Sequence, residues 1–206
     1  MDSRPRGQPT PRAADQPTLG PLRRRPRASY DLRVTGEVRK IRVAGDPVLH
    51  APCLEVTDFG PELARLVEDM FASLAVAEGV GLAAPQIGVA LAVFVYDCPD
   101  ASGVRQVGHV VNPSITTSGS ADLNEEGCLS VPGPFHELER ASAATVRGVD
   151  KTGAPIEVSG TGYFARCLQH ETDHLRGVLY IDHLPRNRRR RVLRDMEPFD
   201  WNAPVP

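Results

Sequence analysis

Residues 169–175 read Gln-His-Glu-Thr-Asp-His-Leu. This stretch predicts two metal ligands on one helix, so the rest of the chain must supply a third ligand. His170 and His174 are four residues apart, and such residues share one face of an α-helix, so both imidazoles can reach one metal ion. Glu171 lies about 100° further around the helix, close enough to act on a metal-bound water. No proline or glycine interrupts residues 164–175, which favours a helix there. The alternative is an amphipathic helix with two core histidines.

The composition is that of a soluble globular protein. Of the 206 residues, 41% are hydrophobic and 24% are charged, and the net charge of −2 gives no global electrostatic reason to expect nucleic-acid binding. No apolar run is long enough for a signal sequence or a membrane span. The four cysteines are scattered and form no C-x-x-C pair: Cys53, Cys98, Cys128 and Cys167. We therefore expect a protein of the reducing cytoplasm, without a membrane partner.

Charge is distributed unevenly along the chain. Residues 1–35 are rich in arginine and proline and poor in large apolar residues, so we expect a disordered extension. Residues 36–185 are expected to form a single compact domain. Residues 186–206 form a basic segment, expected to be helical and then irregular, with six arginines within residues 186–194. A solvated helix is the simplest interpretation of these arginines, and an RNA-facing patch is the alternative.

Hydrophobic periodicity predicts the remaining elements. Apolar residues recur at steps of three and four over residues 61–78, which indicates a core helix ending before Gly79. Apolar and β-branched runs predict four strands, at residues 91–96, 106–111, 141–149 and 156–158, with a turn at 150–153. Strands around two separated helices indicate an α+β fold, with mainly antiparallel sheets wrapped around a central metal-binding helix.

A glycine-rich stretch lies at residues 79–86, with the sequence Gly-Val-Gly-Leu-Ala-Ala-Pro-Gln. It imitates a dinucleotide-binding fingerprint, which should follow a strand and open a helix. Here it follows a helix, and Pro85 and Gly88 prevent a long helix after it. We therefore reject nucleotide binding and expect the glycines to let the backbone approach a substrate or a metal site.

The metal-binding helix needs a third protein ligand, and Cys128 is a candidate. It lies within residues 125–132, Glu-Glu-Gly-Cys-Leu-Ser-Val-Pro, a segment expected to be extended. One thiolate and two imidazoles make a tetrahedral site with one position open, as in catalytic metal sites. A buried structural cysteine is the alternative.

Three segments together resemble the peptide deformylase family. They are the stretches at residues 79–86, 126–130 and 169–175, in the family's order and at its usual separations. With the Asp-Pro-Val-Leu at residues 46–49, the resemblance covers about residues 36–185. It implies a metal-dependent hydrolase that removes the N-formyl group from the N-terminal formyl-methionine of nascent polypeptides and releases formate.

The resemblance also implies roles for individual residues. Metal ligation falls to Cys128, His170 and His174, with ferrous iron as the typical ion and Zn²⁺, Ni²⁺ or Co²⁺ able to substitute. Proton transfer falls to Glu171, and stabilisation of the oxyanion falls to the side-chain amide of Gln86 and the backbone N–H of Leu129. The pocket for the formyl-methionyl peptide is lined by Val80, Gly81 and Gly127. The expected partners are nascent peptides and, through the basic segment, the ribosome.

One departure and two rival functions accompany this interpretation. Residues 133–136 read Gly-Pro-Phe-His where many relatives carry an arginine that contacts the substrate backbone. A zinc endopeptidase would take a third histidine or glutamate after the helix, for which His183 is the candidate. A metal-stabilised RNA- or ribosome-binding module would use the basic ends, but such a module would not need Glu171 and Gln86.

Overall fold

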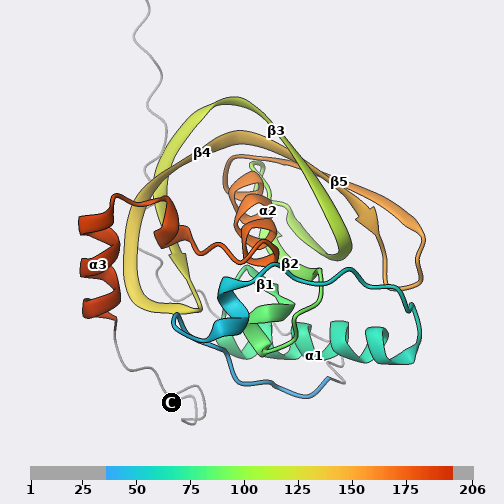
Figure 1. The fold of residues 1–206 in the computed structure, drawn as a ribbon. Helices are drawn as coiled ribbons and strands as arrows, with labels where there is room; N and C mark the ends of the chain where they lie inside the picture. The colour runs from blue at the N-terminus through green and yellow to red at the C-terminus, as the bar shows by residue number, and fades with distance from the viewer. Residues whose placement is uncertain (1–35, 197–206) are drawn as a thin grey trace, which may run out of the picture. The chain divides into compact units, whose positions relative to one another are not determined.

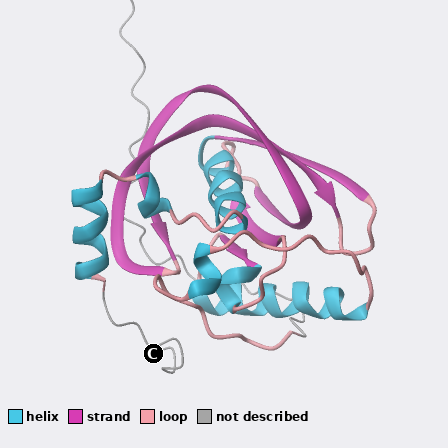
Figure 2. Ribbon diagram, viewed as in Figure 1, coloured by secondary structure: helices cyan, strands magenta, loops and turns pink. Residues whose placement is uncertain are grey.

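The computed structural model describes residues 36–196, which fall within the second of two units of the chain, residues 34–206. The predictions for residues 1–35 and 197–206 lie outside the described residues. The described residues form three α-helices: α1 (Pro61–Ala77), α2 (Gly162–Leu175) and α3 (Arg186–Asp195) (Figures 1 and 2). They also form five strands: β1 (Gly81–Ala83), β2 (Val93–Pro99), β3 (Arg105–Cys128), β4 (Val131–Val149) and β5 (Pro155–Thr161). Three short 3₁₀ helices complete the fold: η1 (Pro47–His50), η2 (Ala84–Ile87) and η3 (Tyr180–His183).

The five strands form one antiparallel sheet in chain order, β1-β2-β3-β4-β5. Strands β3, β4 and β5 arch around α2, the helix that carries the two histidines (Figure 1). This arrangement confirms the predicted α+β fold with an antiparallel sheet around a central helix.

Strand β2 separates two hydrophobic clusters because its side chains alternate between the two faces of the sheet. Val93 and Val95 pack with α1 in one cluster, and Phe94 and Tyr96 pack with Phe164 of α2 in the other. All four β2 residues are buried. The predicted strand at 91–96 and helix at 61–78 therefore correspond to β2 and α1, with ends shifted by a few residues.

Strands β3 and β4 are 24 and 19 residues long and form a hairpin much longer than the sequence predicted. The predicted strands at 106–111 and 141–149 are only its open end. Most of β3 between residues 114 and 125 is partly or fully exposed, so the apolar alternation used to predict strands is missing there. Register shifts interrupt the pairing at three places along the hairpin, between Val111 and Ser114, Ser118 and Ala121, and Glu126 and Cys128.

Helix α2 is buried although its sequence is polar. Ten of its 14 residues are buried, and the sheet supplies partners for several of the polar ones. Gln169 bonds both the N–H and the C=O of Ala141 on β4, and Arg166 donates to the carbonyls of Leu138 and Asp122. Buried polar groups are tolerated when they are paired in this way. Within residues 36–196, no helix is both long and apolar enough to cross a membrane.

Asn112 on β3 bonds the backbone of a separate segment at Val56, much as a paired strand would, and this contact can be tested. Its Oδ1 accepts from Val56 N–H at 2.8 Å and its Nδ2 donates to Val56 O at 2.9 Å. We expect Asn112→Ala to lower the free energy of unfolding by about 1–3 kcal/mol, because the buried Val56 backbone loses both partners. The matched control is Asn124→Ala, an exposed asparagine bonded to Asp122, which should cost less than about 0.5 kcal/mol. Urea unfolding measures both, and equal effects would contradict the assigned role.

Candidate metal centre

Three side chains from two distant segments meet in one place. Cys128 stands at the last residue of β3, and His170 and His174 stand one turn apart on α2. Cys128 Sγ lies 3.2 Å from His174 Nε2, which lies 3.2 Å from His170 Nε2. All three ligand atoms lie within 4.8 Å of one another.

The donor set and its spacing fit a single metal ion. Ligand atoms about 2.0–2.3 Å from one tetrahedral ion lie about 3–4 Å from each other. The two separations of 3.2 Å that involve His174 Nε2 agree with that distance. A thiolate with two imidazoles suits ions such as zinc, iron or nickel. The two-residue turn at Leu129 and Ser130, with Cys128 paired to Val131, holds the thiol at the tip of the hairpin.

Glu126 fixes the orientation of the first histidine. Its Oε1 lies 2.7 Å from His170 Nδ1, which leaves Nε2 turned toward Cys128 and His174. Arg140 donates to both oxygens of Glu126, at 2.7 and 3.1 Å, and Arg166 donates to Oε2 at 3.0 Å. Burial alone would raise the pKa of Glu126, but the hydrogen bonds from His170 and Arg140 hold that pKa well below its usual range.

The sequence interpretation missed Glu126, although it lies in the same motif as Cys128. Strand alternation could not have identified it, because a register shift lies between Glu126 and Cys128, so the rule that residues two apart share a face does not hold there. Arg140 and Arg166 could not be assigned either, because they belong to other elements and reach Glu126 only in the folded hairpin.

Glu171 is buried beside the metal ligands, and one of its carboxylate oxygens lacks a partner in the part of the chain that the structure describes. Its residue is 3% exposed, and its Oε2 has no hydrogen-bond partner among the described residues. Burial raises the pKa of Glu171 to about 7. Gly81 of β1 lies against this carboxylate, and a Cβ at Gly81 would collide with it. An unpaired buried carboxylate is costly in a folded protein and is characteristic of functional sites.

Gln86 presents its amide to the same centre. Its Oε1 accepts from Ala83 N–H at 2.8 Å, so its Nε2 is turned toward Ser130 Oγ at 3.2 Å and Cys128 Sγ at 3.7 Å. Gln86 is 1% exposed. Its N–H groups are therefore fixed in direction beside the ligand cluster.

The remaining site residues from the sequence lie around this centre. Val80 precedes β1, and its carbonyl accepts from Asp97 N–H on the β2 side. Leu129 follows Cys128 and reaches toward Gly79, where a Cβ would come within 2.9 Å of Leu129 Cδ1. Gly127 precedes Cys128, and the ring of Phe135 fills the space where its side chain would be. All nine residues singled out in the sequence thus belong to the same region as the ligand cluster or to the strands beside it.

His183 lies elsewhere. Its Nε2 is 2.9 Å from Asp173 Oδ2, and within residues 36–196 the cluster of possible metal ligands contains only Cys128 and the two histidines of α2. The geometry therefore does not support the third ligand that a zinc endopeptidase would need.

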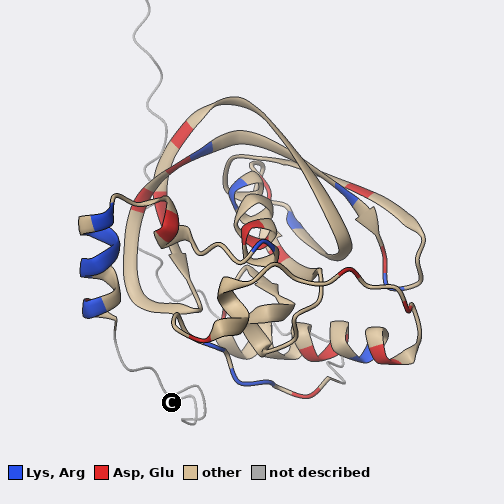
Figure 3. Cartoon of the chain, in the orientation of Figure 1, with Lys and Arg blue, Asp and Glu red and all other residues tan. Residues whose placement is uncertain are grey.

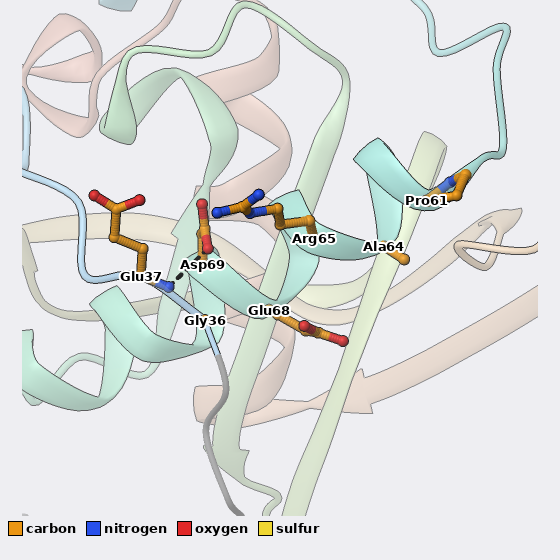
Figure 4. A pocket seen from close by; sticks show the side chains of 7 residues that line it. All are labelled: Gly36, Glu37, Pro61, Ala64, Arg65, Glu68 and Asp69. Atoms are coloured by element: carbon orange, nitrogen blue, oxygen red, sulfur yellow. Dashed lines mark hydrogen bonds between the residues drawn. The ribbon is translucent and has the colours of Figure 1, made fainter.

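A hollow of about 440 Å³ lies away from these residues, between α1 and the first described segment (Figure 4). It contains no cysteine or histidine, and it is lined by Gly36, Glu37, Pro61, Ala64, Arg65, Glu68 and Asp69. It therefore has no part in the candidate metal centre.

Comparison with known proteins points to one family. The profile of the polypeptide deformylase family matches residues 38–190. A peptide deformylase 2 of Streptomyces avermitilis is 58% identical over 175 residues, which cover 83% of this chain and 94% of the relative.

Solved structures agree with the sequence comparison. A peptide deformylase from Legionella pneumophila is 41% identical with a TM-score of 0.71, covering 77% of this chain and 93% of that protein. A peptide deformylase from Ehrlichia chaffeensis, in complex with actinonin, is 33% identical with a TM-score of 0.72, covering 77% and 95%.

Metal content tests the ligand cluster. The unmutated protein should bind one equivalent of metal, and Cys128→Ser should lose it in the presence of a competing chelator, because the soft anionic ligand is gone. Cys53→Ser is the matched control: burial raises the pKa of the Cys53 thiol to about 11, and it is not in the cluster. Elemental analysis after dialysis gives the answer. Full retention of metal by Cys128→Ser, with loss in His183→Ala, would contradict this assignment.

Proposed function

The chain belongs to the peptide deformylase family, and we propose that its removal of the N-formyl group from nascent peptides takes place at a metal ion held by Cys128, His170 and His174. As a family member it is a metal-dependent hydrolase. The observation that carries the proposal is the meeting of three ligand atoms beside a buried, partly unpaired carboxylate. We propose Fe²⁺ as the ion, with Zn²⁺, Ni²⁺ or Co²⁺ able to substitute, since thiolate and imidazole ligands accept all four. Metal analysis of protein prepared without oxygen identifies the ion.

A formamide is a poor electrophile, so the site must supply both a nucleophile and stabilisation of negative charge. The metal ion, when bound, lowers the pKa of water at the site from about 15.7 toward 7 and so provides the nucleophile at neutral pH. In this proposal Glu171 accepts the proton of that water and later delivers it to the leaving amine. A carboxyl group whose pKa lies near 7 can do both at neutral pH, and burial provides that pKa.

The tetrahedral intermediate places negative charge on the former formyl oxygen. We assign its stabilisation to the side-chain amide of Gln86 and the backbone N–H of Leu129. The bond from Ala83 N–H to Gln86 Oε1 supports this role, because it fixes the amide before the substrate arrives. Donors fixed in advance contribute most to stabilisation of the transition state.

We assign the peptide pocket to Val80, Gly81 and Gly127. Strand β1 is buried and pairs only with β2 in the described part of the sheet, so no described strand holds the hydrogen-bonding groups of its other edge. In this proposal an extended peptide pairs with that edge. Gly81 supports selectivity for the formyl group, because the space beside it is already occupied by the Glu171 carboxylate. A bulkier acyl group would collide there, whereas a formyl group needs little room.

Formate release from formyl-Met-Ala-Ser tests the proton-transfer and oxyanion roles. We expect Glu171→Gln to lower kcat/KM by about 10²–10⁴-fold. We expect Gln86→Leu to lower it by about 10²–10³-fold. Both variants should keep one equivalent of metal. Glu125→Gln, at an exposed position of the same hairpin, is the control and should stay near the unmutated rate. Full activity of Glu171→Gln with metal verified would refute its role.

We further propose that the enzyme works in the cytoplasm and meets nascent chains at the ribosome through α3. This helix carries a concentration of positive charge (Figure 3). Arg189 pairs with Asp182, and Arg191 and Arg194 pair with Asp195. Three more arginines form no ion pair with any residue the structure describes, and all are exposed: Arg186, Arg188 and Arg190. Unpaired arginines of this kind suit contact with the phosphates of ribosomal RNA.

Ribosome co-sedimentation at low salt tests this partner. Replacing the three unpaired arginines of α3 by glutamate should strongly weaken co-sedimentation while kcat/KM on the short peptide stays unchanged. The control makes the same change of charge at Lys40, Arg65 and Lys151, which lie outside α3. Unchanged co-sedimentation of the α3 variant would disprove the contact.

A further inference from the structure

A line of hydrogen-bonded side chains joins the metal ligand His170 to the surface residue His183. Its inner part is the carboxylate of Glu126, which holds His170 Nδ1 and is itself held by Arg140. The remaining nitrogen of Arg140, Nη1, donates to Asp173 Oδ2 at 2.5 Å. His183 Nε2 lies 2.9 Å from the same oxygen.

Exposure changes steadily along this line. The side chain of His183 is 39% exposed, that of Asp173 14%, that of Arg140 8% and that of Glu126 4%. The line therefore leads from solvent into the interior, and His183 is its outermost member. Each inner member is desolvated and must keep its partner, because an unpaired buried charge is strongly destabilising.

The 3₁₀ helix that carries His183 also touches the metal site directly. Tyr180, at the other end of η3, stacks on His170 with ring centroids 6.5 Å apart and planes at 26°. Its hydroxyl donates to Pro134 O at 2.9 Å, which ties η3 to β4. This anchoring of η3 fixes where His183 stands relative to Asp173.

We propose that His183 is a positioning residue for the metal centre, acting through Asp173, Arg140 and Glu126 on the orientation of His170. The inference rests on the proposed function, since it takes His170 as a metal ligand. By donating to Asp173, His183 fixes the carboxylate that receives Arg140. Arg140 is then held between two carboxylates, Asp173 and Glu126, in a single arrangement. Glu126 in turn keeps His170 Nδ1 bonded and Nε2 directed at the other ligands.

Two substitutions distinguish the effect of the His183 hydrogen bond from the effect of its side-chain volume. His183→Phe keeps a ring but has no donor, and His183→Gln keeps an N–H donor. Loss of a direct partner of a metal-bound histidine typically costs about 10–100-fold in metal affinity, so this more distant one should speed metal release about threefold to tenfold. We expect that change in His183→Phe and recovery toward the unmutated rate in His183→Gln. Release of nickel to a chelator measures it.

A spectroscopic readout and a matched control complete the test. The visible absorption of the cobalt-loaded protein should shift in His183→Phe, because the ligand geometry changes, and should not shift in His50→Phe. His50 is an exposed histidine whose Nε2 accepts from Gly45 N–H and which lies outside the line. In the double variant with Asp173→Asn, release should be no faster than in Asp173→Asn alone, since both act on one line.

The outcomes distinguish this inference from the function on which it rests. Unchanged release and absorption in His183→Phe, or equal loss in His183→Phe and His183→Gln, would overturn the positioning role while leaving the enzyme intact. An unmutated protein that binds no metal, or that binds it without Cys128, would instead overturn the proposed ligand set.

Discussion

The structure depends on keeping a polar helix in the interior. Helix α2 buries five polar or charged side chains, and each needs a partner or a purpose: Arg166, Gln169, Glu171, Thr172 and His174. The sheet and the helix backbone pair the first, second and fourth of these. The atoms left unpaired among the described residues are Glu171 Oε2 and His174 Nδ1. Among the fully buried side-chain nitrogen and oxygen atoms of α2, only these two, at residues of the candidate site, lack a partner within residues 36–196, which is the pattern that a functional site produces.

The long β3–β4 hairpin supplies the residues that pair with α2 and complete the ligand cluster. A shorter one would provide the hydrophobic contacts of β3 and β4 but would not carry Cys128 to the histidines or Arg140 to Glu126. Most of β3 is partly or fully exposed to solvent, and the irregular register of the hairpin allows it to bend around α2. The candidate metal centre therefore lies at the contact between the hairpin and α2, and both elements contribute residues to it.

This division explains what the sequence could and could not predict. The spacing of His170 and His174 is local to one helix, so it predicted both the helix and the pairing of the imidazoles. Cys128 is 42 residues away from His170. It could be predicted as a ligand only because the glycine-rich stretch and the histidine motif occur in the same sequence. The length of β3 was missed because exposed strands lack apolar alternation. The ion pairs around Glu126 were missed because they join residues from three elements. Sequence periodicity within one element does not predict such contacts.

The position of Cys128 at the tip of the hairpin gives the proposed metal ion a mechanical function beside its chemical one. Bound to a strand end and to a helix, the ion closes a covalent-like ring of more than forty residues, and such closure reduces the freedom of the unfolded chain in the way that a disulfide does. In the cytoplasm that we propose for this protein, a disulfide would not persist, and the ion would serve in its place. The free energy of binding the proposed metal ion would then also stabilise the folded chain, so the same ion would support both the fold and the reaction.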